Sequence, residues 1–226
     1  ARTAEQIYND YKTTHGTLVG DTKFVDGKIG KALTFDGTGD YVNVADNASL
    51  QVESGNFTIS IWVKPSAVQQ QAILFKGNPN MGNGYILVMN RFGNDITLTK
   101  GGIADQAVSY TFQANTWYHI VAVQPLGGNV TYYINGVSIG SYSNTSNYSS
   151  SSGWPFHIGD ADTYFANKFN GLIDDVRIYN YSRTAEQVMQ DYNDGKSARL
   201  GAQTAGVADP WGGALPVAHW ALDENA

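Results

Sequence analysis

The sequence of 226 residues is long enough for one large β domain, or for one domain with tails. Its formal charge is −6 and its Lys and Arg are not clustered, which excludes a nucleic-acid partner because phosphate binding needs such clusters. There is no cysteine, and no apolar run approaches the roughly 18 residues of a membrane helix, so we expect neither disulfides nor membrane insertion. Charged residues are only 15% of the chain, which is typical of an extracellular β protein with polar loops.

The chain opens with a segment that occurs twice. Arg2–Tyr11 matches Arg183–Tyr192 at seven of ten positions, with an offset of 181 residues. Each copy has Thr three residues before Gln, the spacing of a helix capping box, so each predicts a short helix. The offset is a plausible module length. We therefore interpret residues 1–12 as a helix that resembles the tail of a preceding repeat in a tandem-repeat protein.

Between the two copies the hydrophobic period is two, as in half-buried strands. Apolar and polar residues alternate through Phe57–Val63 and again through Trp117–Val123, and Asn135-Gly136 separates two short strands in the manner of a type I′ hairpin. Further strands are expected near residues 31–36, 40–44, 72–76, 84–89, 95–99, 107–112, 155–159 and 170–179. This spacing predicts an all-β fold, an antiparallel β-sandwich with a short helix after the closing strand.

Several ordered motifs resemble the laminin G-like, concanavalin A-like jelly rolls. The motifs are Gly27–Gly37 with Asp40–Val42, then Phe57–Pro65, Trp117–Ala122, Tyr132–Gly136, and a closing Phe169–Tyr179 before the helix. The resemblance covers residues 13–192, which we expect to form one jelly-roll domain. It implies the fold more strongly than it implies a ligand.

The end of the chain departs from the pattern of that family. Residues 193–216 are rich in Gly, Ala and Ser, with Pro210 and Pro216, and predict a linker. Residues 217–226 then contain a strand-like stretch of the kind with which such modules commonly begin. This stretch either starts a next module or completes this one, by folding back or by strand exchange between chains. Because proteins avoid a bare sheet edge, we expect residues 217–223 to be ordered against the sandwich.

Four carboxylates are candidates for a structural Ca²⁺ site. Asp36 and Asp40 bracket a Gly-rich turn, and Asp174 and Asp175 lie in the closing strand. Ca²⁺ takes six to eight oxygen ligands, commonly carboxylates and loop carbonyls, and the resemblance supports such a site because many jelly rolls carry a structural Ca²⁺. The alternative is that these carboxylates cap backbone N–H groups in turns or pair with Arg177.

A second set of residues is a candidate for ligand binding. Asp160 and Asp162 lie in a loop after a predicted strand, with the alternative of a plain solvated turn. Aromatic rings pack against the apolar face of a sugar, and we assign that role to Trp154, Tyr164 and Tyr85. The resemblance implies that Trp62 and Trp117 are core residues.

Catalysis is poorly supported by the sequence. A retaining glycosidase needs two nearby carboxylates, but the only glutamates are Glu5, Glu53, Glu186 and Glu224, and the four histidines lack metal-ligand spacing. We therefore predict a non-catalytic, extracellular or cell-surface binding module with a glycan as its ligand. A structural spacer or an adhesion repeat that binds a cell-surface protein is the alternative, and a polysaccharide hydrolase or lyase is a minor one.

Overall fold

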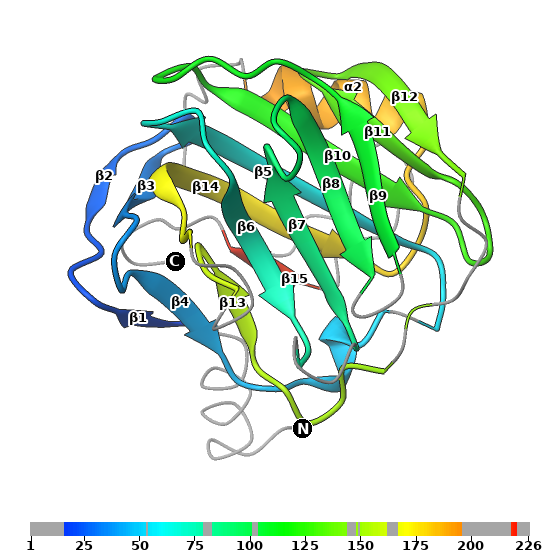
Figure 1. Ribbon diagram of the computed structural model, residues 1–226, viewed down its shortest axis with the longest axis horizontal. Helices are drawn as coiled ribbons and strands as arrows, with labels where there is room; N and C mark the ends of the chain where they lie inside the picture. The colour runs from blue at the N-terminus through cyan, green and yellow to red at the C-terminus, as the bar shows by residue number, and fades with distance from the viewer. Residues whose placement is uncertain are drawn as a thin grey trace, which may run out of the picture.

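The computed structural model describes residues 16–52, 54–78, 83–100, 104–143, 148, 150–161, 167–195 and 218–220. The helix expected at residues 1–12 and most of the linker expected at 193–216 lie outside these residues. Within them, two sheets stack face to face as an antiparallel sandwich, which confirms the predicted fold class (Figure 1). None of the described helices is long and apolar enough to cross a membrane.

The strands of each sheet come from distant parts of the chain, as in a jelly roll. The first sheet contains, in spatial order, β1 (Thr17–Val19), β4 (Tyr41–Val44), β13 (Phe156–Ile158), β6 (Gln71–Lys76), β7 (Tyr85–Met89), β8 (Asp95–Lys100) and β9 (Ala104–Ser109). The second contains β12 (Val137–Tyr142), β11 (Val130–Ile134), β10 (Tyr118–Gln124), β5 (Phe57–Pro65), β14 (Asn170–Tyr179), β3 (Lys31–Asp36) and β2 (Phe24–Asp26), and β15 (Ala218–Trp220) joins it beside β14. A 3₁₀ turn, η1 (Ala48–Leu50), and the helix α2 (Ala185–Asp194) complete the described elements.

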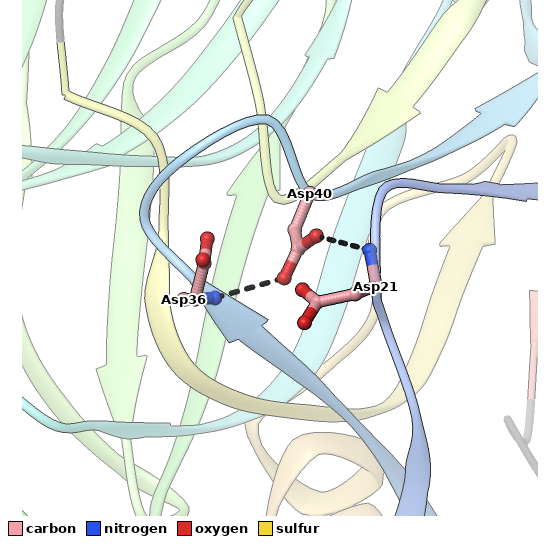
Figure 2. A group of neighbouring side chains, drawn as sticks. All are labelled: Asp21, Asp36 and Asp40. Carbon is pink, nitrogen blue, oxygen red and sulfur yellow. Dashed lines mark hydrogen bonds between the residues drawn. The ribbon is translucent and has the colours of Figure 1, made fainter.

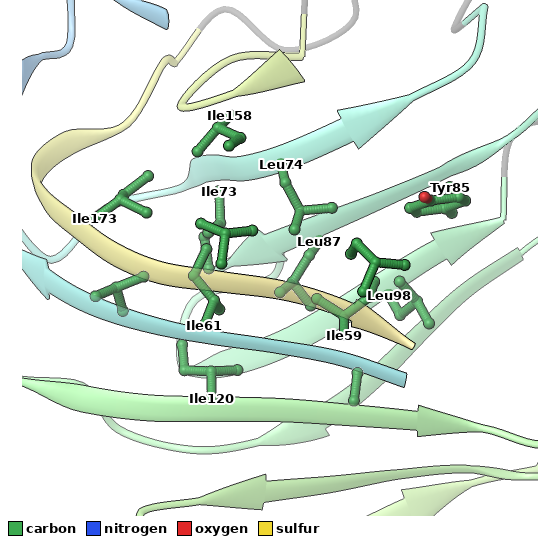
Figure 3. Close-up of a cluster of buried hydrophobic side chains, with 14 of the residues drawn as sticks. Ile59, Ile61, Ile73, Leu74, Tyr85, Leu87, Leu98, Ile120, Ile158 and Ile173 are labelled. Carbon is green, nitrogen blue, oxygen red and sulfur yellow. The ribbon is translucent and has the colours of Figure 1, made fainter. Parts of the chain in front are cut away.

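The core lies between the two sheets and follows the period of two seen in the sequence (Figure 3). Ile59 and Ile61 of β5 face Leu87 and Leu98 of the first sheet, and none of the four side chains is exposed. Burying one such side chain is worth about 1.5–3 kcal/mol, so this layer supplies the main driving force for folding.

One buried hydroxyl ties the two sheets together. Tyr132 of β11 belongs to the second sheet, yet its hydroxyl accepts a hydrogen bond from Leu98 N at 2.7 Å and donates one to the Gln106 carbonyl at 2.5 Å, both in the first sheet. Burial raises the pKa of this phenol well above its usual value, so it remains a donor at neutral pH.

The predicted hairpin turn is confirmed. Asn135 and Gly136 join β11 to β12 with positive φ angles of 54° and 80°, as a type I′ turn requires. The Asn135 side-chain oxygen also accepts the backbone N–H of His119 at 3.0 Å, which links the turn to the neighbouring β10.

The helix α2 covers the outer face of the second sheet. It begins with the expected capping box, in which Thr184 accepts from Gln187 N and the Gln187 side chain accepts from Thr184 N. Tyr192 stacks on Trp62 at 5.7 Å between ring centroids, and the Asp191 carboxylate lies 2.8 Å from Arg183. Trp62 is therefore buried as expected, but beneath α2 and not between the sheets.

Candidate functional site

Three carboxylates meet where two turns come together at one end of the sandwich (Figure 2). Asp21 lies in the turn between β1 and β2, Asp36 ends β3, and Asp40 directly precedes β4. One ligand oxygen from each of the three lies within 4.8 Å of the others, and the side chains point toward one another. The β3–β4 turn is also one of the places where the chain crosses from the second sheet to the first.

Asp40 is the fixed member of this acidic group. Its side chain is buried, and its two oxygens accept the backbone N–H of Asp21 at 2.8 Å and that of Asp36 at 3.0 Å. Gly20 adjoins it with a φ of 84°, and a Cβ atom there would stand 2.1 Å from Asp40 Oδ1, so only glycine fits. Asp36 in turn accepts Thr38 N at 2.5 Å, which closes the β3–β4 turn.

The acidic group has the chemistry and spacing of a Ca²⁺ site. Ca²⁺ binds hard oxygen donors at about 2.3–2.6 Å, so two ligands on opposite sides of the ion are about 5 Å apart. Three oxygens that lie within 4.8 Å of one another are compatible with this. One cation, Lys23, lies 4.0 Å from Asp21, and both side chains are exposed. Asp21 was missed by the sequence analysis, although its position next to Gly20 in a tight turn is the same signal that singled out Asp36 and Asp40.

Asp174 and Asp175 do not join this group. Asp174 Oδ2 accepts the backbone N–H groups of Lys28 and Ile29 at 2.7 and 2.8 Å, and Asp175 forms an ion pair with Arg177 at 2.8 Å. These are the contacts expected under the alternative of turn capping and arginine pairing.

The residues predicted to bind a ligand fall in different environments. Tyr85 is wrong as a sugar-stacking residue, because its ring is fully buried in the core, 5.5 Å from Phe57, and its hydroxyl donates to the Leu50 carbonyl. Trp154 is half-buried, and its carbonyl accepts a hydrogen bond from the buried Lys76. Asp162 and Tyr164 lie outside the described residues.

Asp160 belongs to a cluster on the outer face of the first sheet. Its carboxylate pairs with Lys168 at 2.5 Å, and the Lys168 ammonium lies 5.5 Å from the centre of the Tyr41 ring. Tyr41 is half-buried and packs against His157 at 4.8 Å between ring centroids. We call these four residues the Tyr41 cluster. Tyr41 directly follows Asp40, so the cluster and the acidic group share the start of β4.

A half-buried ring beside a charged side chain is one arrangement that can contact a sugar. The ring offers an apolar face, and the partly exposed Lys168 ammonium can bond hydroxyls, whereas the Asp160 carboxylate is buried and paired with it. The sequence analysis did not assign Tyr41 to a site, because its motif Asp40–Val42 was used only for the fold, and it missed Lys168, which belongs to no recognisable motif. Tyr41 could have been predicted from its position directly after Asp40, a carboxylate in a turn.

The two stacked antiparallel sheets define a jelly-roll sandwich. The family model Laminin_G_3, of the concanavalin A-like lectin/glucanases superfamily, matches residues 36–189, and the chain belongs to this family. The match begins at Asp36 of the acidic group and ends within α2.

Similar proteins include a domain of an extracellular arabinanase, a neurotoxin binding domain and an adhesion receptor. Domain 4 of AbnA, a GH43 extracellular arabinanase from Geobacillus stearothermophilus solved in complex with arabinotriose, is 27% identical with a TM-score of 0.66, over 77% of this chain and 86% of that one. The binding domain of botulinum neurotoxin serotype G is 18% identical with a TM-score of 0.64, over 80% of this chain and 47% of that one, and indicates shared fold only.

Among curated proteins, the adhesion G-protein coupled receptor V1 of Danio rerio is 28% identical over 176 residues. The match takes in 72% of this chain but 3% of the receptor. The chain thus corresponds to one small part of that protein.

Proposed function

We propose that this chain is a non-catalytic carbohydrate-binding module of an extracellular or cell-surface protein. The observation that carries the proposal is its similarity, at 27% identity and a TM-score of 0.66, to an arabinanase domain whose structure holds arabinotriose. Family membership agrees with a binding role, because it places the chain among lectin-like sandwiches. The name of the family also includes glucanases. The choice between binding and catalysis therefore depends on which side chains this chain has at the site.

The described residues favour binding over hydrolysis. Of the four glutamates, the structure describes only Glu186, which is exposed on α2 over the second sheet and not beside the Tyr41 cluster of the first sheet. Asp160 is held in an ion pair with Lys168 and has no second described carboxylate bonded to it. A glycosidase needs two opposed carboxyl groups with distinct protonation states.

The Tyr41 cluster is the proposed sugar contact. The exposed part of the Tyr41 ring offers an apolar surface to the C–H face of a sugar, and the partly exposed Lys168 ammonium, held in place by the buried Asp160, could bond its hydroxyl groups. Asp162 and Tyr164 belong to the segment between these two residues, and they remain part of the proposed ligand-binding set together with Trp154.

The acidic group supplies the proposed Ca²⁺ site. Asp21, Asp36 and Asp40 would hold the ion, which would neutralise their mutual repulsion and stiffen the turn that precedes Tyr41. A ligand that binds only the native state must stabilise it, so added Ca²⁺ is expected to raise the melting temperature, and Asp40→Asn is expected to weaken that response.

Oligosaccharide binding tests the proposal directly. The purified chain is titrated with arabino-oligosaccharides and screened on a glycan array, with and without a chelator. We expect binding that falls about two- to tenfold in Tyr41→Ala, since aromatic stacking is worth about 0.5–1.5 kcal/mol. Phe92→Ala is the matched control, because Phe92 is an aromatic residue with 66% of its surface exposed in the β7–β8 turn.

A protein-binding adhesion repeat is the second candidate, and the 28% identity to an adhesion receptor favours it. Absence of glycan binding by a folded chain, in the presence and in the absence of Ca²⁺, would overturn the carbohydrate proposal and leave this second candidate standing.

A further inference from the structure

Lys76 ends β6 at a position that faces the core. Its cross-strand neighbours are Tyr85 in β7 and Phe156 in β13, and both of these side chains belong to the core. Residues directly opposite each other lie on the same face of a sheet, so Lys76 shares the core face. None of its side chain is exposed. A buried ammonium is costly unless other groups pair with it, so its partners must be accounted for.

Three oxygen atoms contact the Lys76 ammonium. The Asp46 carboxylate lies 2.5 Å from it and the Ser151 carbonyl 3.4 Å from it, and the Trp154 carbonyl accepts a further hydrogen bond. An ammonium has three N–H donors, so these acceptors can satisfy all of them. Although burial alone would raise it, the pKa of Asp46 is held below its ordinary value because Lys76 and Gly153 N donate to the carboxylate. Asp46 is therefore charged at neutral pH.

The same ion pair fixes the turn that carries Trp154. Residues 151–154 form this turn, and Trp154 N donates to the Ser151 carbonyl at 3.2 Å. Lys76 holds the carbonyl groups at both ends of the turn. Asp46 accepts the N–H of Gly153 within it at 2.7 Å. The ion pair therefore contacts the turn at three of its backbone groups.

The turn at residues 151–154 is open to a ligand. Ser152 and Gly153 are exposed, and Trp154 is only half-buried. Gly153 has a φ of 85°, and a Cβ atom there would meet no atom within 4 Å. The neighbours of Trp154 in the turn are thus small and leave free space beside it. A fixed aromatic side chain in such a place offers a large contact area at a low cost in conformational entropy.

Stability alone does not account for the Asp46–Lys76 pair. A buried ion pair adds little compared with apolar residues of the same size, because desolvation of two charges offsets their attraction. Buried ionic groups can instead specify one geometry over others. The geometry that this pair specifies is that of residues 151–154, since its remaining hydrogen bonds go mainly to that turn.

We propose that Asp46 and Lys76 are positioning residues of the sugar-binding surface, and that they act by holding Trp154 where its ring stacks on the ligand. The inference rests on the proposed carbohydrate-binding function and adds a second aromatic contact to the Tyr41 cluster. Trp154 lies just before β13, and Tyr41 lies beside the last residues of that strand, so the two contacts are at opposite ends of β13. A contact that is ordered before binding loses less conformational entropy when the ligand binds.

The test is a double-mutant cycle on the full-length chain. Lys76→Met combined with Asp46→Asn removes both charges together, so that neither is left buried and unpaired. This pair variant, Trp154→Ala and the combination of the two are titrated with arabinotriose, or with a stronger ligand if the glycan array finds one. Lys31→Met combined with Asp26→Asn is the matched control, because it removes an exposed ion pair on the second sheet.

We expect Trp154→Ala to weaken binding about two- to tenfold, and the control pair to bind like wild type. The pair variant should weaken binding by up to the same factor, and the combination by no more than Trp154→Ala alone, because the pair acts through that ring. Amide exchange at Gly153 should become faster in the pair variant, while its melting transition shows that it is folded.

A milder substitution serves if that variant does not fold. Lys76→Gln combined with Asp46→Asn also removes both charges, but the Gln amide can still donate to a carbonyl of the turn. Its loss of affinity should be smaller and should again disappear in the Trp154→Ala background.

Three results would overturn the inference and leave the proposed function standing. The first is wild-type affinity in Trp154→Ala when Tyr41→Ala binds more weakly. The second is an equal further loss when the pair variant is made in the Trp154→Ala background, which would mean that the pair acts elsewhere. The third is wild-type affinity in a folded pair variant whose Gly153 amide exchanges faster. A folded wild-type chain that binds no glycan would overturn both.

Discussion

At the scale of single residues, the hydroxyl of Tyr132 is the sharpest test of how the two sheets are joined. Tyr132→Phe leaves Leu98 N and the Gln106 carbonyl without their partner inside the core. An unsatisfied buried polar group costs about 1–3 kcal/mol, so we expect the free energy of unfolding to fall by about that amount. Urea denaturation measures it. Tyr133→Phe, on the adjacent and half-buried residue, is the control and should change stability by less.

His119 makes a second residue-scale prediction, on pH dependence. Burial lowers its pKa to about 3, whereas the unfolded chain titrates near 6.5. Between these values the unfolded state binds more protons, so this residue's contribution to stability is complete above about pH 6.5 and is lost as the pH falls toward 3.

The expected loss is about 3–5 kcal/mol over that whole range, from the size of the shift. Asp191 acts in the opposite direction, because burial raises its pKa to about 6 despite the nearby Arg183, so its contribution falls as the pH rises from about 4 to 6. The unfolding midpoints of wild type and His119→Gln at several pH values separate the two. Parallel curves would show that His119 does not titrate on unfolding.

Site residues could be predicted from the sequence where they lie together in one local turn. Asp36 and Asp40 come together as expected because Asp36-Gly-Thr-Gly-Asp40 is a local turn whose geometry depends on few distant contacts. Tyr85 was wrongly assigned to sugar binding because the assignment relied on its aromatic ring. It gave too little weight to the buried strand in which Tyr85 lies. Asp21 carries the same local signal, a carboxylate beside glycine in a turn, but its meeting with Asp36 and Asp40 depends on the pairing of β1 with β4, and Lys168 reaches Asp160 and Tyr41 only in the folded chain.

At the scale of elements, the cap of α2 makes a defined contribution. Thr184→Ala removes the acceptor for Gln187 N, and loss of such an N-cap costs about 1 kcal/mol. Thr184→Ser keeps the oxygen and is the matched control. Because α2 holds Tyr192 against Trp62, the alanine variant should also show faster amide exchange in α2 in hydrogen-exchange measurements. Equal exchange in the two variants would contradict the role of the cap.

Most strands were predictable because alternation and turn residues agree along them. Phe57–Pro65 and the hairpin at Asn135-Gly136 match their expected positions. The strand expected at 107–112 is instead β9, which spans Ala104–Ser109, and the three-residue strands β1 and β2 were not predicted. Strands this short have too few residues to show a period, and their pairing partners decide whether they form.

At the scale of the whole molecule, the jelly roll was predictable because its motifs occur in a fixed order along the chain, and the family match over residues 36–189 agrees with them. Residues 217–223 were expected to be ordered against the sandwich, and the described part of them, Ala218–Trp220, pairs with β14; which strand they would join could not be predicted. The sequence does not say which segment pairs with a given strand edge. The structure shows that Ala218–Trp220 of the same chain pair with this one. The repeat at residues 1–12 and the tandem arrangement it suggests remain predictions.

The two hydrogen bonds of Asp40 have a mechanical consequence. Tension on the chain ahead of β1 would peel that strand from β4 one residue pair at a time, since force acts on each rung of the ladder in turn. The peeling halts at Asp21, whose N–H is held by the buried Asp40, which also grips Asp36 at the end of β3. The load then passes along β3 into the second sheet. The contacts of Asp40 thus resist a force applied at the first strand before it reaches the rest of the sandwich.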